Sequence, residues 1–133
     1  MAIRVVRLGS PRVRGEGTRL GTVRRPPRGV RKTRYAAQDY FDVWLPNLAP
    51  SARLMKLTKN TGGVDDSGRW SIFAVRYRSE MNQPDNRRVL EALAALSHHT
   101  NFSVGCYCED EDHCHRSLLR SILKGHGATI SPR

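Results

Sequence analysis

The sequence predicts an α/β fold, a single small domain in which a short, mostly parallel sheet is flanked by helices. Short β-branched and apolar runs, which are typical of strands, lie near both ends of the chain. Between these runs, apolar residues recur at the spacing of amphipathic helices. Strands separated by helices favour parallel pairing, because the chain crosses over before it returns to the sheet. The 133 residues, 38% of them hydrophobic, are enough for one globular core.

Three segments are distinguished within this one domain, which we expect to span residues 1–133. A basic N-terminal segment, residues 1–34, contains two predicted strands within Ala2–Leu8 and Thr18–Arg25. A helical middle covers residues 35–98. The remainder, from residue 99 onwards, holds a strand, a turn rich in cysteine and histidine, and a last helix.

The first helix of the middle segment is predicted to begin at Asp39, a suitable N-cap residue. The apolar residues that follow share one helical stripe, and a proline limits the length of the helix. The residues of this stripe are Tyr40, Phe41, Trp44, Leu45 and Leu48.

The clearest amphipathic helix follows the glycine-rich loop at residues 60–68, with Asp66 or Ser67 as its predicted cap. Further helices are predicted after Pro50, after Pro84 and after the cysteine-rich turn. Helical spacing places the aromatic side chains in the core rather than on a base-stacking surface. The aromatic residues concerned are Trp44, Trp70 and Tyr77, and the buried face after Pro84 is Val89, Leu90, Leu93 and Leu96.

The positive charge is concentrated in the first quarter of the chain. Residues 1–34 contain eleven basic side chains and one acid, a net charge of +10, whereas residues 35–133 contain twelve basic and eleven acidic side chains. Arginine dominates the basic segment, and its planar guanidinium recognises phosphate and carboxylate groups through paired hydrogen bonds. This pattern favours an anionic partner, a nucleotide or a nucleic acid. A solvated basic arm without a partner is the alternative interpretation.

The stretch CYCEDEDHCHR, residues 106–116, contains all three cysteines of the chain. Cys106 and Cys108 end the predicted strand Phe102–Cys108, so we expect their side chains to point to the same face. Asp112 is the predicted N-cap of the helix that follows. A strand, a tight loop and a helix N-terminus would place this turn at the carboxyl edge of the sheet, where open α/β folds bind ligands.

One interpretation of the turn is a soft-metal site, with zinc as the metal. Thiolate sulfur and imidazole nitrogen in a set of four match the tetrahedral preference of zinc. The donors would be Cys106, Cys108, Cys114 and His115, or His113 in place of His115.

A second interpretation is a thiol active site. Cys114, or else Cys106, would be the nucleophile, His115 the base and Arg116 the anchor for an anion. On a regular helix His115 would point about 100° away from Cys114, which disfavours a hydrogen bond between them. A third interpretation is structural, because small buried thiols are common in protein cores.

Four motifs occur in order along most of the chain, and with them the chain resembles the family catalogued as domain of unknown function 488, often called YeaO-like. The resemblance implies an α/β fold and a clustering of the motif residues, and it carries no agreed activity. Pro26 stands where the family usually has an aromatic residue, and Cys108 where many relatives have a carboxylate. The motifs are TRLGTVRRPPRGVRK, with Arg19, Arg24, Pro27, Arg28 and Gly29; DVWLPNLAPS, with Asp42, Trp44, Leu45, Leu48, Ala49, Pro50 and Ser51; FAVRYRSEM, with Arg76, Tyr77 and Glu80; and CYCEDEDHCHRSLL, with Cys106, Cys114, His115 and Arg116.

We therefore expect a cytoplasmic protein that does not span a membrane and that binds a phosphate-rich ligand, nucleotide or nucleic acid, in a pocket beside the cysteine turn. The acids Glu109–Asp112 would repel a phosphate placed directly on the turn and suit contacts with the basic segment. An enzymatic role is compatible with this hypothesis. The alternative is a non-catalytic, nucleic-acid-associated module whose turn is structural or holds a metal. The predicted ligand-binding residues are Arg19, Arg24, Arg28 and Arg116.

Overall fold

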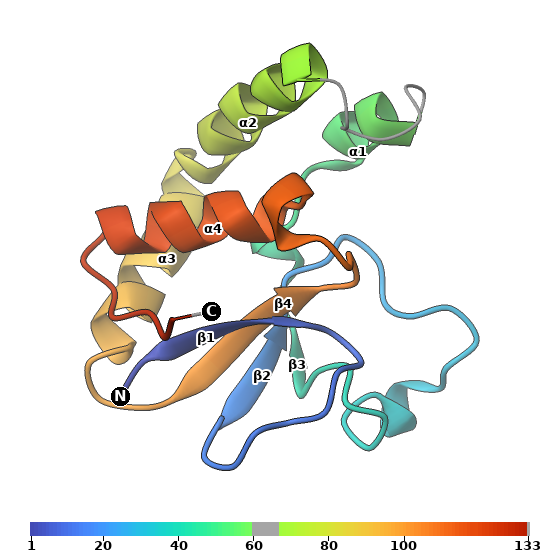
Figure 1. Cartoon of the computed structure of the whole chain (residues 1–133), viewed down its shortest axis with the longest axis vertical. Helices are drawn as coiled ribbons and strands as arrows, with labels where there is room; N and C mark the ends of the chain where they lie inside the picture. Colours follow the sequence, from blue (N-terminus) through green and yellow to red (C-terminus); the bar gives the residue numbers. More distant parts are fainter. Residues whose placement is uncertain (60–66, 133) are drawn as a thin grey trace.

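The computed structural model describes residues 1–59 and 67–132. In this part of the chain four strands form one parallel sheet in the order β1-β4-β2-β3 (Figure 1). The predicted α/β fold with a parallel sheet is therefore confirmed. Strand β4 pairs with both β1 and β2, so the two N-terminal strands lie on either side of it. The strands are β1 (Ile3–Arg7), β2 (Thr18–Gly21), β3 (Val43–Trp44) and β4 (Phe102–Cys106).

The described α-helices gather on one face of the sheet (Figure 1). Helix α4 lies over the strands, and α2 and α3 pack against α4. The helices predicted around Tyr77, after Pro50, after Pro84 and after the cysteine-rich turn are confirmed. The elements are α1 (Ala52–Lys59), α2 (Ser67–Met81), α3 (Pro84–Leu96) and α4 (His115–Gly125), with short 3-10 helices η1 (Lys32–Arg34), η2 (Pro46–Leu48) and η3 (Glu111–His113).

The main core lies between the helices and the sheet. Val104 of β4 and Leu119 of α4 are both fully buried in it. Tyr77 is also fully buried, and Trp70 packs against the same cluster, as predicted. In α3 the predicted buried face is correct except at Leu96, which is 50% exposed at the end of the helix.

The helix predicted from Asp39 is wrong. The backbone at Asp39 is left-handed, with φ of 61°, and the chain then adds strand β3 to the edge of the sheet. The amide of Asp42 donates to the carbonyl oxygen of Arg19 at 2.8 Å, and the amide of Leu45 donates to that of Gly21 at 2.9 Å. Pairing with β2 thus satisfies the backbone groups that a helix would have satisfied, and it overrides the local apolar stripe.

The edge position of β3 changes the environment of two aromatic residues. Trp44, which was expected in the core, is 43% exposed. Phe41 is buried and packs on Gly21, where a Cβ atom would lie 2.3 Å from the phenyl ring. Gly21 therefore makes room for Phe41, and any larger residue would displace the ring.

Two strands end earlier than predicted. Strand β2 ends at Gly21 rather than near Arg25, and β4 ends at Cys106 rather than at Cys108. Parallel strands share one direction, so the residues that follow β2 and β4 meet at the same edge of the sheet. The cysteine-rich turn begins at this edge.

The loop at residues 60–66 and the predicted cap, Asp66 or the side chain of Ser67, lie outside the part of the chain that the structure describes. Among the helices that are described, none has the length and apolar character needed to cross a membrane.

Candidate functional site

Two cysteines and a histidine come together at the carboxyl end of β4. Cys106 is the last residue of the strand, Cys114 is the N-cap of α4, and His115 is the first residue of that helix. The side chains are buried, and their donor atoms all lie within 4.8 Å of one another. The three residues, together with Cys108, form what we call the Cys/His cluster.

The imidazole of His115 is oriented by a backbone contact. Its Nε2 lies 2.8 Å from the carbonyl oxygen of Thr22, the residue that follows β2. A carbonyl oxygen only accepts hydrogen bonds, so Nε2 carries the proton and Nδ1 keeps its lone pair. Nδ1 lies 3.8 Å from Sγ of Cys114. Burial lowers the pKa of His115 to about 4, so the ring is neutral at pH 7.

This geometry corrects two expectations about the turn. Asp112 is not the N-cap of the last helix, because it lies within η3. The cap is Cys114, whose backbone is extended, with φ of −127° and ψ of 150°. Cys114 is therefore not a helical neighbour of His115, and the predicted 100° separation between the two side chains does not apply.

The third cysteine, Cys108, lies beyond the end of β4 and is exposed, while its thiol remains within interaction range of the other two. Hydrogen bonds with Cys106 and then with Cys114 lower the pKa of Cys108, and nearby His115 and Arg116 lower it further. The hydrogen bonds with Cys108 and Cys114, together with burial, raise the pKa of Cys106. Of the three thiols, that of Cys108 is the one whose ionised form its surroundings favour.

Arg116 lies against the cluster and is almost completely buried. Its Nη2 donates to the carbonyl oxygen of Cys108 at 2.6 Å, whereas its buried Nε has no hydrogen-bond partner. In residues 1–59 and 67–132 no ion pair includes Arg116. Burial acts to lower the pKa of Arg116, but Cys106, Cys114 and Glu111 together raise it. The thiols and the carboxylate of Glu111 are therefore the groups that favour the charged guanidinium.

The acids of the turn interact with basic side chains. Glu109 reaches Arg7 of β1 at 3.4 Å, which is a contact between the turn and the basic N-terminal segment. Glu111 pairs with Arg120 at 2.9 Å, and a carboxylate oxygen of Asp110 lies 2.7 Å from Nδ1 of His113. Arg7 and Arg120 neutralise part of the acidic charge beside the cluster and reduce its repulsion of an anion.

Arg19 does not line an open pocket, which corrects one of the predicted ligand-binding positions. Its side chain is fully buried and forms an ion pair with Glu16 at 2.7 Å. Arg19 is in register with Ser103, whose hydroxyl donates to the same carboxylate at 2.6 Å. Because side chains alternate along a strand, Ser103 and Cys106 face opposite sides of the sheet. Arg19 therefore stabilises the core on the face away from the cluster.

Arg24 has a structural role as well. Its guanidinium donates to three backbone carbonyl oxygens within residues 46–50, at 3.0 to 3.2 Å. The same segment is held from α2, where the hydroxyl of Tyr77 donates to the carbonyl oxygen of Leu48 at 2.7 Å. Arg24, residues 46–50 and Tyr77 belong to the first three sequence motifs, so these three motifs contact one another here. The fourth motif contains the cysteines and the histidine of the cluster.

Arg28 is exposed in the connection after β2. Of the four predicted ligand-binding arginines, Arg116 is the one that contacts the cluster in the described part of the chain. Sequence analysis missed two residues at this site. Thr22 orients His115 through its carbonyl group, for which no sequence signal exists. Tyr107, between two cysteines, donates from its hydroxyl to the carbonyl oxygen of Arg25 at 3.0 Å.

Comparison with known proteins gives one family. Residues 3–127 match the family model DUF488-N3a, described as the active DUF488-N3 subclade. The comparisons with curated proteins and with solved structures returned no match. The matched region includes the whole Cys/His cluster and all four motifs.

Proposed function

The chain belongs to the DUF488 family, in its N3a subclade, and on that premise we propose that it binds a phosphate-bearing ligand, a nucleotide or a nucleic acid, beside a thiolate centre formed by the Cys/His cluster. The subclade is described as active, and that description names no residue and no reaction. The free thiols of all three cysteines favour a reducing compartment, so we place this function in the cytoplasm.

The observation that carries the thiolate centre is the buried guanidinium of Arg116. A buried charge is strongly destabilising unless an opposite charge lies close to it. Arg116 is among the groups that lower the pKa of the neighbouring Cys108 thiol. One thiolate in the cluster would balance the guanidinium, and Cys108 is exposed enough to meet a ligand.

The anionic ligand is supported by the basic loop, which we define as residues 24–34. It contains six basic residues and no acid, and five of the six are exposed. The loop begins near the cluster: the hydroxyl of Tyr107, which lies between Cys106 and Cys108 in the sequence, donates to the carbonyl oxygen of Arg25, and His115 contacts Thr22, two residues before the loop. Exposed guanidinium groups therefore lie on a loop that begins near the thiolate centre.

Binding of a labelled single-stranded oligonucleotide and of a labelled adenine nucleotide tests the ligand class. We expect affinity to fall with rising salt. Replacement of Arg25 and Arg28 by Gln should reduce the salt slope for the oligonucleotide by up to about 1.4, since each lost phosphate contact on a single strand accounts for about 0.7. The matched control replaces Arg53 and Arg88, exposed on α1 and α3, by Gln. Equal losses in the two double variants, or no binding of either ligand, would refute this proposal.

Alkylation at neutral pH, followed by mass spectrometry, tests the thiolate centre. With a chelator present, Cys108 should react first and faster than an ordinary cysteine, because a lowered pKa increases its thiolate fraction. The buried Cys106 and Cys114 provide the internal comparison and should react only when the protein unfolds. Slow labelling of Cys108 would contradict a stabilised thiolate.

A second candidate function is zinc binding by the same cluster. The 3.8 Å between Nδ1 of His115 and Sγ of Cys114 is close to the roughly 3.6 Å expected for two ligands of one tetrahedral zinc ion. The Nε2–H contact with Thr22 is the outer contact that metal-binding histidines usually make. Cys106, Cys114 and His115 would hold the ion, with Cys108 as the fourth donor.

Elemental analysis of the purified protein tests this candidate. About one zinc per chain is expected, and it should be lost when Cys106 and Cys114 are both replaced by Ser. If the double variant does not fold, the wild-type chain can be treated with a chelator instead. Thiols that held zinc should then become reactive toward a thiol-reactive dye. Protein without zinc would leave the thiolate centre as a metal-free site.

A further inference from the structure

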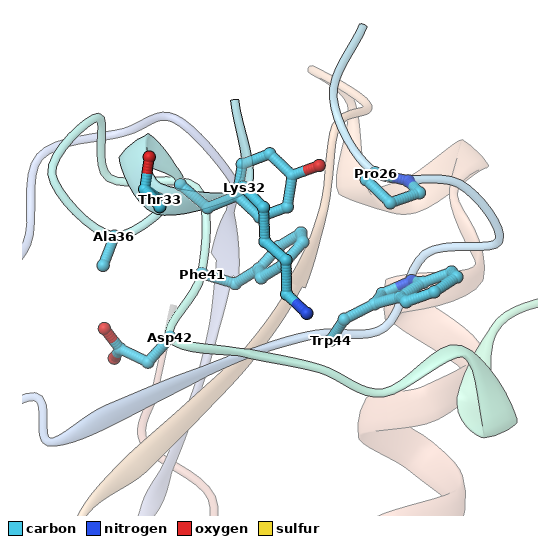
Figure 2. Close-up of a pocket in the computed structure, with 8 residues that line it drawn as sticks. Pro26, Lys32, Thr33, Ala36, Phe41, Asp42 and Trp44 are labelled. Atoms are coloured by element: carbon cyan, nitrogen blue, oxygen red, sulfur yellow. The ribbon is translucent and has the colours of Figure 1, made fainter. Parts of the chain in front are cut away.

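A pocket of about 280 Å³ lies beside the basic loop, and none of the cysteines is among its lining residues (Figure 2). Its walls come from the basic loop, from the turn that follows η1, and from the edge strand β3. It combines flat apolar surfaces with a cationic group and is open to solvent at several exposed residues. The lining includes Pro26, Lys32, Tyr35, Phe41 and Trp44.

The indole of Trp44 is held in place at one side of the pocket. Its Nε1 donates to the carbonyl oxygen of Val23 at 2.8 Å, while 43% of the residue remains exposed. Phe41, on another wall, is fixed by its packing on Gly21. A fixed aromatic face that stays exposed is suited to stacking with a planar ring, because little side-chain freedom is lost on binding.

A cation lies beside these aromatic rings. Figure 2 shows the side chain of Lys32 extending across the pocket, with its ammonium group toward Trp44. The acid in the lining, Asp42, is engaged by Arg12 at 2.8 and 3.1 Å and by the amide of Arg19 at 2.8 Å. Arg12, which also contacts Asp39 at 3.4 Å, offsets part of this negative charge, and Lys32 is the cation of the lining. The exposed arginines of the basic loop lie on the segment that contributes Pro26 and Lys32 to the pocket.

We propose that this pocket binds one unpaired base of a single-stranded nucleic acid, stacked on Trp44, with the flanking phosphates on Lys32 and the arginines of the basic loop. This inference rests on the proposed function and specifies its ligand. Pockets for drug-sized ligands and cofactors have volumes of about 300 to 1,000 Å³. The 280 Å³ found here suits a single base and is too small for a dinucleotide cofactor.

A continuous strand explains the extent of the charged surface better than a free nucleotide does. Exposed Arg25, Arg28, Arg31, Lys32 and Arg34 are spread over the length of the basic loop, and a single nucleotide would engage few of them. Aromatic stacking combined with a track of cations is the usual way in which proteins bind single strands. A duplex would not serve, because its bases are already stacked and paired.

Two variants distinguish the contribution of phosphate contacts to the binding affinity from the contribution of base stacking. Trp44→Leu removes the stacking surface, and we expect about tenfold weaker binding of a single-stranded oligonucleotide with an unchanged salt slope. Lys32→Gln, an exposed change that leaves the fold intact, should instead reduce the salt slope. Ile72→Ala, at a residue 52% exposed on α2, is the control for loss of an exposed apolar side chain.

Fluorescence gives a direct readout of stacking. The chain has two tryptophans, so Trp70→Phe leaves Trp44 as the only one. Its emission should be quenched by the oligonucleotide and not by a duplex of the same sequence. Binding of the oligonucleotide with full affinity by Trp44→Leu would overturn this inference while leaving the proposed function intact. A mononucleotide that binds as tightly as the oligonucleotide would exclude a strand. Failure of both ligands to bind would refute the proposed function itself.

Discussion

The Nε2–H of His115 donates to the carbonyl oxygen of Thr22 across 2.8 Å. The contact joins the first residue of α4 to the residue that follows β2, although 93 positions separate them in the sequence. It selects the tautomer in which Nδ1 faces Cys114. One backbone oxygen thus decides which ring nitrogen is available for chemistry at the cluster.

Replacement of His115 by Phe should lower the free energy of unfolding by about 1 to 3 kcal/mol, because the carbonyl group of Thr22 would lose its buried donor. Urea unfolding in the presence of a chelator measures this cost without any contribution from metal. The exposed His99, replaced by Ala, is the control and should change stability by less than about 0.5 kcal/mol. Equal stability of the two variants would contradict an orienting contact.

Arg19 and Arg28 belong to the same sequence motif and should behave differently when replaced by Met. Arg19→Met leaves the carboxylate of Glu16 buried without its cation, and a loss of about 3 to 5 kcal/mol is expected. Arg28→Met changes an exposed side chain and should cost less than about 0.5 kcal/mol. Thermal unfolding followed by circular dichroism distinguishes the two. A stable Arg19→Met protein would show that the ion pair does not hold the core together.

The Glu16 carboxylate predicts a specific acid sensitivity. Burial acts to raise its pKa, but hydrogen bonds from Arg19, Ser103 and the amide of Val13 lower it from 4.5 to about 2. Between pH 4.5 and 2 the Glu16 carboxylate is therefore protonated in the unfolded chain and ionised in the folded chain. Stability is full above this window and falls as the pH drops through it, by up to about 3 kcal/mol.

Chemical unfolding at a series of pH values measures this dependence. The slope of the free energy of unfolding against pH measures how many more protons the unfolded chain binds than the folded chain. In Glu16→Gln this number should be smaller by up to one between pH 4.5 and 2, because the titrating carboxyl group is gone. An unchanged slope in that variant would assign the acid sensitivity to other carboxylates.

Gly21→Ala should destabilise the protein by about 1 to 3 kcal/mol, since its Cβ would lie 2.3 Å from the ring of Phe41. Gly125→Ala is the matched control. A Cβ there meets nothing within 4 Å, and the residue lies in α4, so a gain of up to about 1 kcal/mol is expected. Thermal unfolding compares the two variants. The displaced Phe41 should also alter the pocket, so oligonucleotide binding by Gly21→Ala should weaken.

Several elements followed from local patterns. The spacing of apolar residues around Tyr77 and Leu90 placed two helices correctly, because the buried face of a helix repeats along the chain itself. The β-branched run near Val5 placed the first strand. The same logic failed from Asp39 to Leu48, where β3 pairs with a distant strand and tertiary hydrogen bonds decide the structure.

At the candidate site, too, some features followed from the sequence and others did not. Neighbouring positions in the sequence indicated that Cys106, Cys114 and His115 lie together, and the structure brings them within 4.8 Å. The arginines of the basic segment could not be assigned from the sequence. Arg19 and Arg28 look equivalent in a motif, yet one is buried against Glu16 and the other is exposed.

From its amino acids alone this protein could be assigned an α/β architecture, a basic N-terminal segment and a cluster of thiols with an imidazole, because each depends on periodicity, composition or adjacency in the chain. Only the tertiary structure decided that Thr22 orients His115, that Arg116 is buried against the thiols, and that Trp44 borders an open pocket. These features depend on contacts between segments far apart in sequence, and no local pattern encodes where such segments meet.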